Sequence, residues 1–153
     1  MTQQQLAETL DQSAIDQMCE ESTIEVLDAM FFEPPVKPPE WAEHPSPEAA
    51  RANVMFEGSL CGRVSVAAMP PVLSSLAASF LGRDAGEIGE SERWYILAEL
   101  ANIACGSLLS RLAPEGHMRL SPPIHVPELE GAGERWMKLT LADGELYFAV
   151  RIS

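Results

Sequence analysis

The sequence predicts an α+β domain in which an antiparallel sheet packs against two long helices. Three observations lead to this prediction. Residues 91–112 form a proline-free stretch with apolar side chains on nearly every side of a helical wheel, as in a buried helix. Residues 14–32 carry a broad apolar side opposite their acidic residues, which indicates an amphipathic helix. Residues 135–141 and 145–152 alternate around an Asp-Gly pair, a strong hairpin signal.

The first half of the chain is predicted to hold a helix, a hairpin and a short second helix. Residues 1–13 are expected to fray, and residues 14–153 to form one domain. Residues 33–50 contain six of the twelve prolines, so we expect a semi-rigid surface linker that is neither helix nor central strand, with Trp41 pinning it to the body. Strands are predicted over 52–56 and 63–69.

The second half is predicted to hold the central helix and three strands. A helix over 70–82 is opened by two prolines and ended by a glycine, and the central helix follows it. Residues 118–126 are extended but interrupted by two prolines, which predicts an edge or bulged strand. The hairpin over 135–152 completes the order αββααβββ.

Composition narrows the classes of function. The 153 residues include 10 basic and 23 acidic side chains, and the net charge of −13 argues against binding to nucleic acid or to an anionic membrane surface. No run of 18 apolar residues or signal-peptide pattern is present. Three cysteines without CxxC spacing suit a reducing compartment, so a cytoplasmic location is expected.

Metal and cofactor chemistry has no support in the sequence. The three histidines lack the spacing of metal ligands, and no phosphate-binding glycine loop, dinucleotide motif or GxSxG motif occurs. We therefore expect neither a metal nor a cofactor of the chain's own.

One line along the central helix is polar. At about 100° per residue, five residues fall within a narrow wedge of the helical wheel, and Tyr95 lies on the edge of this wedge. The five residues are Glu92, Glu99, Asn102, Gly106 and Ser110. This line has three interpretations: it is the solvent-exposed strip of the helix, or Glu99 and Asn102 satisfy nearby backbone, or it is a working site. In the third interpretation Glu99 holds a partner's cation and Asn102 orients a water, while Gly106 lets the partner approach closely.

The motif Glu-Leu-Ala-Asn-Ile-Ala-Cys-Gly over residues 99–106 resembles the ExxNxxxG signature of the CheC/CheX/FliY phosphatases, which hydrolyse the phospho-aspartate of the chemotaxis response regulator CheY. Residues 55–66 resemble the glycine-punctuated hairpin of that family, and residues 70–82 its next short helix. The resemblance covers residues 14–32 and 50–153, is closest to CheX, and implies a CheC-like fold.

The resemblance also implies a mechanism and a partner. Glu99 would pair with the active-site lysine of a phosphorylated receiver domain, and Asn102 would align water with the aspartyl phosphate. Magnesium would be supplied by the receiver. This chain departs from the family at Tyr95, where Asp or Ser is common, and at Ala98, where Gly is common. The alternative is a non-catalytic receiver-binding or adaptor module of the same fold, like the flagellar-switch relatives.

Two further expectations concern repeats and assembly. The segment from Glu25 to Asp28 looks like a degenerate second copy of the motif, in which Asp28 is a poor substitute for asparagine; a solvated acidic face is the alternative interpretation. The terminal strand 145–152 is rich in β formers, and as an unpaired edge it would recruit another chain. Since CheX-like relatives dimerise, a homodimer is predicted.

Overall fold

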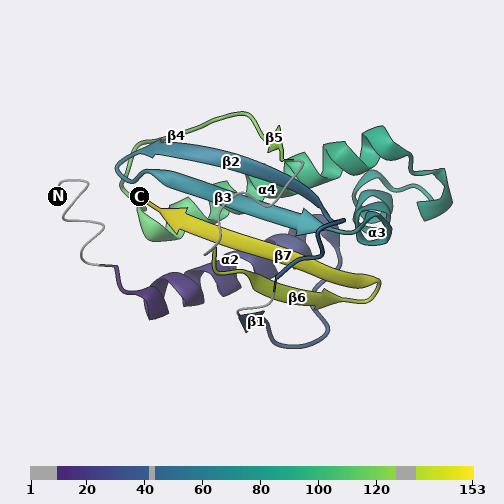
Figure 1. Cartoon of the computed structure of the whole chain (residues 1–153), viewed down its shortest axis with the longest axis horizontal. Coiled ribbons are helices and arrows are strands. Elements are labelled where there is room, and N and C mark those ends of the chain that lie inside the picture. The colour runs from purple at the N-terminus through teal and green to yellow at the C-terminus, as the bar shows by residue number, and fades with distance from the viewer. Residues whose placement is uncertain (1–9, 42–43, 127–133) are drawn as a thin grey trace.

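The computed structural model describes residues 10–41, 44–126 and 134–153. It confirms the α+β prediction, because seven strands of this part of the chain form one antiparallel sheet and the long helices α2 (Gln12–Phe31) and α4 (Glu90–Leu112) lie together behind it (Figure 1). The shorter α3 (Pro70–Leu81) packs against α4 and against strand β7 (Gly144–Ile152). No helix among the described residues is both long and apolar enough to span a membrane.

The helix ends follow from local chemistry. α2 begins two residues before the predicted start because the Asp11 carboxylate accepts a hydrogen bond of 2.7 Å from the Ala14 N–H. The predicted fraying of residues 1–13 otherwise falls on residues outside the described ones. α3 begins at Pro70 and ends at Gly82, whose φ of 67° gives the left-handed conformation that glycine adopts without strain.

The sheet has the order β1-β6-β7-β3-β2-β4, and β5 also pairs with β2. The predicted elements occur in the predicted order, but the order αββααβββ omitted two strands: β1 is an addition, and the 118–126 segment is divided into two short strands that both pair with β2. The strands are β1 (Glu40–Trp41), β2 (Ala50–Gly58), β3 (Gly62–Ala68), β4 (Met118–Leu120), β5 (Ile124–His125), β6 (Met137–Leu141) and β7 (Gly144–Ile152).

The expected edge position of the terminal strand is wrong. β7 lies inside the sheet, where it pairs with β3 along one side and with β6 along the other. Its backbone groups are therefore used within the chain, and they do not offer an edge to another molecule. An exposed terminal strand therefore no longer supports the predicted homodimer. The homodimer stays a prediction that rests on the family resemblance.

The proline-rich segment is more than a linker, which corrects the prediction for residues 33–50. Glu40 and Trp41 form the short edge strand β1, which pairs with β6. An edge strand tolerates nearby prolines, because one side of its backbone has no partner in the sheet. The expected pinning by Trp41 is confirmed: its Nε1–H donates to Glu20 Oε1 at 2.9 Å, and the Arg135 guanidinium lies 4.5 Å from the centre of its ring.

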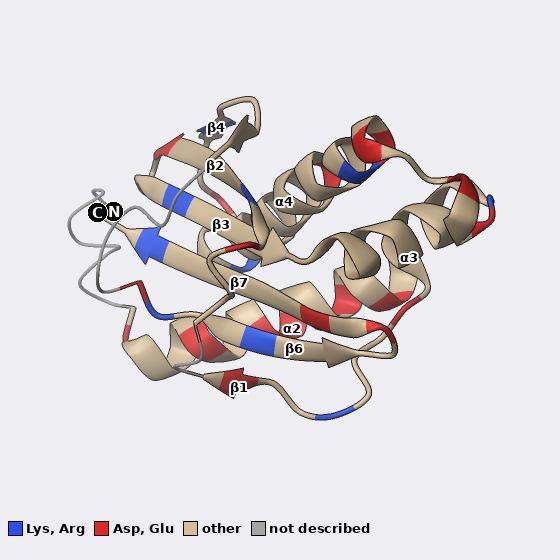
Figure 2. Cartoon of the chain, turned by 45° about the vertical axis from the view of Figure 1, so that its right-hand side comes forward, with Lys and Arg blue, Asp and Glu red and all other residues tan. Residues whose placement is uncertain are grey.

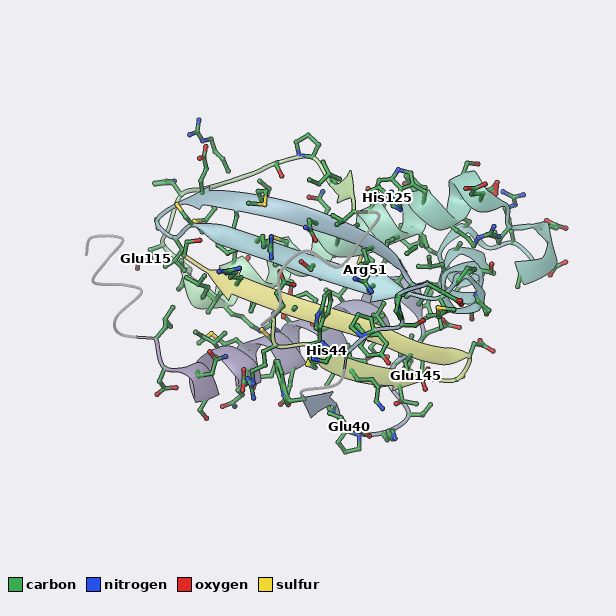
Figure 3. All side chains as sticks on the ribbon, viewed as in Figure 1. Glu40, His44, Arg51, Glu115, His125 and Glu145 are labelled. Atoms are coloured by element: carbon green, nitrogen blue, oxygen red, sulfur yellow. The ribbon has the colours of Figure 1, made fainter. Side chains whose placement is uncertain are left out.

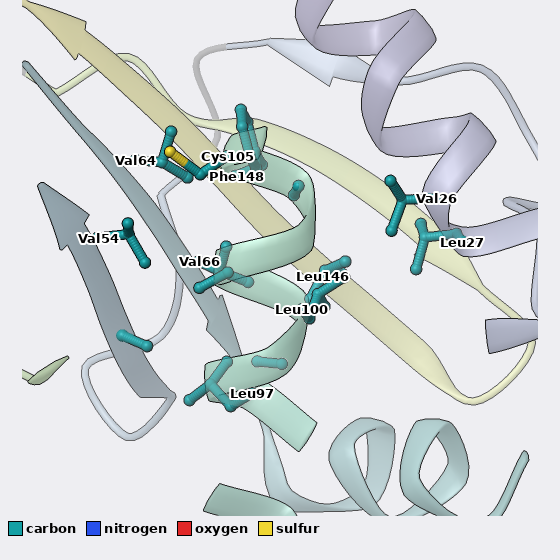
Figure 4. Packing of buried hydrophobic residues seen from close by; sticks show 14 of the residues in the cluster. Val26, Leu27, Val54, Val64, Val66, Leu97, Leu100, Cys105, Leu146 and Phe148 are labelled. Atoms are coloured by element: carbon teal, nitrogen blue, oxygen red, sulfur yellow. The ribbon is translucent and has the colours of Figure 1, made fainter. Parts of the chain in front are cut away.

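The core lies between α4, α2 and the sheet (Figure 4). Leu97, Leu100 and Cys105 of α4 are fully buried, and they are surrounded by valines of β2 and β3 and by Leu146 and Phe148 of β7. Val26 and Leu27 of α2 close the same core from the side. Burial on this scale holds α4 rigidly, so the residues on its remaining face have fixed positions.

The buried thiols give a prediction about reactivity and pH. Burial raises the pKa of both Cys19 and Cys105 to about 12, so the native protein holds almost no thiolate at either residue. In native protein at pH 7 we expect slow maleimide labelling of both, with the partly exposed Cys61 reacting first. Peptide mass spectrometry measures the rates, and labelling in urea serves as the control. Rapid native labelling of Cys105 would contradict this assignment.

The same shifts fix the sign of a pH effect. Both folded-state pKa values lie above the unfolded value of about 9, so protons leave the unfolded chain first as the pH rises. The thiols leave stability unchanged below pH 9, and the free energy of unfolding should fall between pH 9 and 12.

Candidate functional site

Helix α4 carries the candidate site. The Gly89 N–H donates to Glu92 Oε2 at 3.1 Å at its start, and Arg111 lies in its last turn, so both ends suit the helix dipole. The buried side of α4 faces the sheet, α2 and α3. The exposed line is the one that the sequence predicted, with Tyr95, Asn102 and Ser110 exposed and Glu99 and Gly106 partly buried.

Two polar residues of this line have structural roles and two do not. Glu92 caps the helix, and the Ser110 hydroxyl donates to the Gly106 carbonyl at 2.9 Å. Within the described part of the chain, neither Glu99 nor Asn102 makes a side-chain hydrogen bond or ion pair. The interpretation in which these two side chains satisfy nearby backbone therefore has no support. Their carboxylate and carboxamide are available to another molecule.

Gly106 leaves open space beside this pair. A Cβ built on Gly106 would meet no atom of the chain within 4 Å, apart from the backbone of its own helix turn. Glycine inside a helix costs roughly 0.5–1 kcal/mol relative to alanine, and no intramolecular contact here requires it. The arrangement fits a surface that another backbone approaches closely.

Tyr95 lies one turn before Glu99 on the same line, and 47% of its surface is exposed. Its ring is free to contact a bound molecule, and it occupies space beside the carboxylate. The structure thus brings together all four residues that the sequence singled out, namely Tyr95, Glu99, Asn102 and Gly106, on one exposed helix face.

The site is a helix surface and not a cavity. A shallow groove of about 990 Å³ runs along the outer side of α2, and a cavity of about 480 Å³ lies beside Trp94 and His125. Neither is lined by Glu99 or Asn102. Small-molecule sites are usually concave, whereas an exposed helix face suits insertion into the cavity of a protein partner.

The electrostatics of the two layers differ. Figure 2 shows acidic residues along α2 and both signs of charge at the start of α4, whereas β3 and β6 carry basic residues and β7 carries both signs. Glu99 therefore lies in the acidic layer. A partner with exposed lysine would be attracted to the helical side of the molecule.

No metal site is apparent in the part of the chain that the structure describes, since no three His, Cys, Asp or Glu side chains come together there. His44 and His125 lie on separate segments (Figure 3). His125 packs edge-on against Trp94, with ring centroids 5.4 Å apart.

The two acidic residues of the α2 segment that looks like a degenerate second copy of the motif are exposed, as the alternative interpretation of a solvated acidic face also expects. Glu25 forms an ion pair with Arg111 of α4, and Asp28 is exposed but ionisable where the α4 copy has asparagine. Four residues after Asp28 stands Phe32, as Gly106 stands four residues after Asn102. At the positions that match Glu99, Asn102 and Gly106, the α2 segment therefore has an ion-paired glutamate, an aspartate and a phenylalanine.

Sequence reasoning missed Arg111 and Phe32. Arg111 donates from Nη1 to Ser107 Oγ at 2.9 Å and joins α4 to α2 through Glu25. Its partner is 86 positions away, so no local pattern could reveal it. Phe32 could have been noticed by extending the repeat alignment four residues beyond Asp28.

The fold and the site together define a class: a single α+β domain that presents an unpaired carboxylate and carboxamide on one rigid helix. The family model described as chemotaxis phosphatase CheX matches residues 51–132, which are 82 of the 153 residues and include all of α4. The chain belongs to the CheX family.

Solved structures agree with this assignment at the level of the fold. A chemotaxis protein CheX from Desulfovibrio desulfuricans is 15% identical, with a TM-score of 0.71 over 91% of this chain and 99% of that one. A CheC-like protein from Shewanella sp. PV-4 is 17% identical, with a TM-score of 0.71 over 94% and 99%. The CheX-CheY-BeF3-Mg2+ complex from Borrelia burgdorferi is 17% identical, with a TM-score of 0.68 over 90% and 97%. A comparison with curated proteins finds no significant match.

Proposed function

We propose that this chain is a phosphatase that hydrolyses the aspartyl phosphate of a CheY-like receiver domain in a chemotaxis pathway. The observation that carries the proposal is the unpaired Glu99 and Asn102 on the exposed face of α4, beside the open space at Gly106. Family membership and the CheX-CheY complex among the similar structures support it.

In the proposed mechanism the two side chains divide the work. Glu99 pairs with a lysine of the receiver and fixes the orientation of docking. The Asn102 carboxamide donates to and accepts from a water, and holds it in line with the phosphorus atom. Water attacks the phosphorus atom, and the bond between phosphorus and the aspartyl oxygen breaks. Inorganic phosphate is released, and the receiver keeps its unmodified aspartate. Magnesium belongs to the receiver in this scheme.

Tyr95 favours a second candidate, a receiver-binding or adaptor module without catalysis. Its half-exposed ring stands one turn before Glu99, where the family commonly has a smaller residue. A ring in that place could hold the receiver too far from Asn102 for water to be aligned, because misplacement by about 1 Å can cost 100-fold in rate. The decay of labelled phosphate on receivers, with and without this protein, separates the two candidates.

The role of Glu99 gives a prediction about binding. Glu99→Gln keeps the shape and removes the charge, so we expect affinity for a beryllofluoride-activated receiver to fall on the order of 10-fold at low salt. The loss should shrink at high salt, where the ion pair is screened. Calorimetric titration at two salt concentrations measures both effects.

Glu90→Gln is the matched control, because it removes the same charge from the opposite side of α4. An equal loss of affinity in both variants would mean that the overall negative charge of the helix attracts the receiver. It would contradict a specific ion pair between Glu99 and a receiver lysine.

A further inference from the structure

The end of α2 has an unusual residue for its conformation. Phe32 adopts φ 58° and ψ 27°, and among the described residues it is the only non-glycine with positive φ. Its N–H and that of Glu33 both donate to the Leu27 carbonyl, five and six residues back, so the last turn of α2 is wider by one residue than in a regular left-handed helix ending. α3 has the regular ending, in which Gly82 takes the left-handed conformation and its N–H and that of Arg83 donate to the Ala78 carbonyl. Left-handed backbone is unfavourable for a residue that carries a side chain, so the turn itself does not explain a phenylalanine at this position.

Phe32 also contributes little to the core. Its surface is 67% exposed, whereas the neighbouring Phe31 is fully buried and stacks on Phe80 with ring centroids 5.1 Å apart. The fold therefore bears the strain of Phe32 and gains little apolar burial from it. Strain of this kind at an exposed aromatic residue is typical of a contact site.

The position of Phe32 relative to the candidate site follows from the helix packing. α2 and α4 run antiparallel, and Glu25 pairs with Arg111 (Figure 1). Phe32 lies seven residues beyond Glu25, about 10 Å along the axis. The same distance back along α4 from Arg111 reaches Ala104, between Asn102 and Gly106. Because an extended Arg side chain spans several ångströms, this pair places Phe32 near the level of the motif to within about two helical turns. Its neighbours Phe31 and Glu33 contact Phe80 and Ser75 of α3.

We infer that Phe32 is a docking residue for the receiver, one that extends the interaction surface from α4 to the end of α2. This inference rests on the proposed docking of a receiver at α4. The exposed ring offers an apolar contact beside the charged pair formed by Glu99, and a flat aromatic side chain loses little conformational entropy when it is covered. It acts on affinity and not on the hydrolytic step, since it lies on a different helix from Asn102.

The test is Phe32→Gly, measured in both activity and stability. Glycine relieves the left-handed strain, so the free energy of unfolding should stay the same or rise, while KM for the phosphorylated receiver should rise on the order of 10-fold at unchanged kcat. Phe32→Asn, which also tolerates this backbone, should behave alike. The matched control is Val36→Ala, which removes an exposed apolar side chain beside Thr140 of β6 and should leave KM unchanged.

Each outcome decides a different point. If KM is unchanged in both Phe32 variants, the docking role is overturned while the phosphatase proposal stands. If stability falls together with affinity, Phe32 is a structural residue and the inference is also overturned. If the wild-type protein hydrolyses nothing, the phosphatase proposal fails, and affinity for a beryllofluoride-activated receiver replaces KM. If it binds no receiver either, both proposals fall.

Discussion

Asn102→Ala should slow receiver dephosphorylation by on the order of 100-fold while binding survives. The side chain is exposed and makes no hydrogen bond within the described chain, so its removal leaves the fold intact. What is lost is the group that positions the attacking water, and positioning supplies most of the catalysis in phosphoryl transfer. The measurement is single-turnover decay of labelled phosphate on a receiver, together with calorimetric binding.

Two further variants sharpen this result. Asn102→Asp keeps the shape but would put a negative charge near the phosphoryl group, and it should be as inactive as the alanine variant. Ser110→Ala changes another exposed residue of the same line and should leave the rate unchanged. Full activity in the Asn102→Ala variant would contradict the proposed role of Asn102 in positioning the water. If the wild-type protein binds a receiver without accelerating hydrolysis, the adaptor function is the correct one, and Tyr95 is the residue to change to Asp or Ser.

Gly62→Ala should lower the free energy of unfolding by about 3 kcal/mol or more. A Cβ at this position of β3 would lie 2.0 Å from the Arg151 carbonyl oxygen and 2.7 Å from Phe56 Cζ. The first of these atoms is backbone of β7 and cannot move without breaking the pairing of β3 with β7. Urea unfolding, monitored by circular dichroism, measures the change.

Gly106→Ala is the matched control for the same substitution. No atom outside the local helix backbone lies within 4 Å of its Cβ, so alanine should stabilise α4 by roughly 0.5–1 kcal/mol. The two glycine variants should therefore differ in sign. A small loss in Gly62→Ala would mean that the strands separate more easily than their packing indicates.

The helices were predictable because their signals are local. An apolar pattern on nearly all sides of residues 91–112 identified the buried helix, and its one polar line identified the exposed face. The residues of the candidate site followed from that line and from the motif over 99–106. Their roles remain proposals, because spacing alone cannot say what a carboxylate and a carboxamide will bind.

Neighbours in the sheet were not predictable in this way. The alternation in β7 shows which side chains face the core, but it is the same for an edge strand and a central one, so the edge assignment had no reliable basis. β1 was missed because prolines on both sides of it mask a two-residue strand. Phe32 was missed because a helix ending of this type predicts glycine.

The central position of β7 has a consequence for how the molecule assembles. β3 and its partner β7 are separated by some 80 positions, so the middle of the sheet closes only after a long loop of chain has been ordered. Until the β6–β7 hairpin arrives, the hairpin of β2 and β3 presents a bare apolar edge. During synthesis this edge stays open until residues 144–152 have left the ribosome, so we expect the nascent chain to be most prone to aggregation before that point.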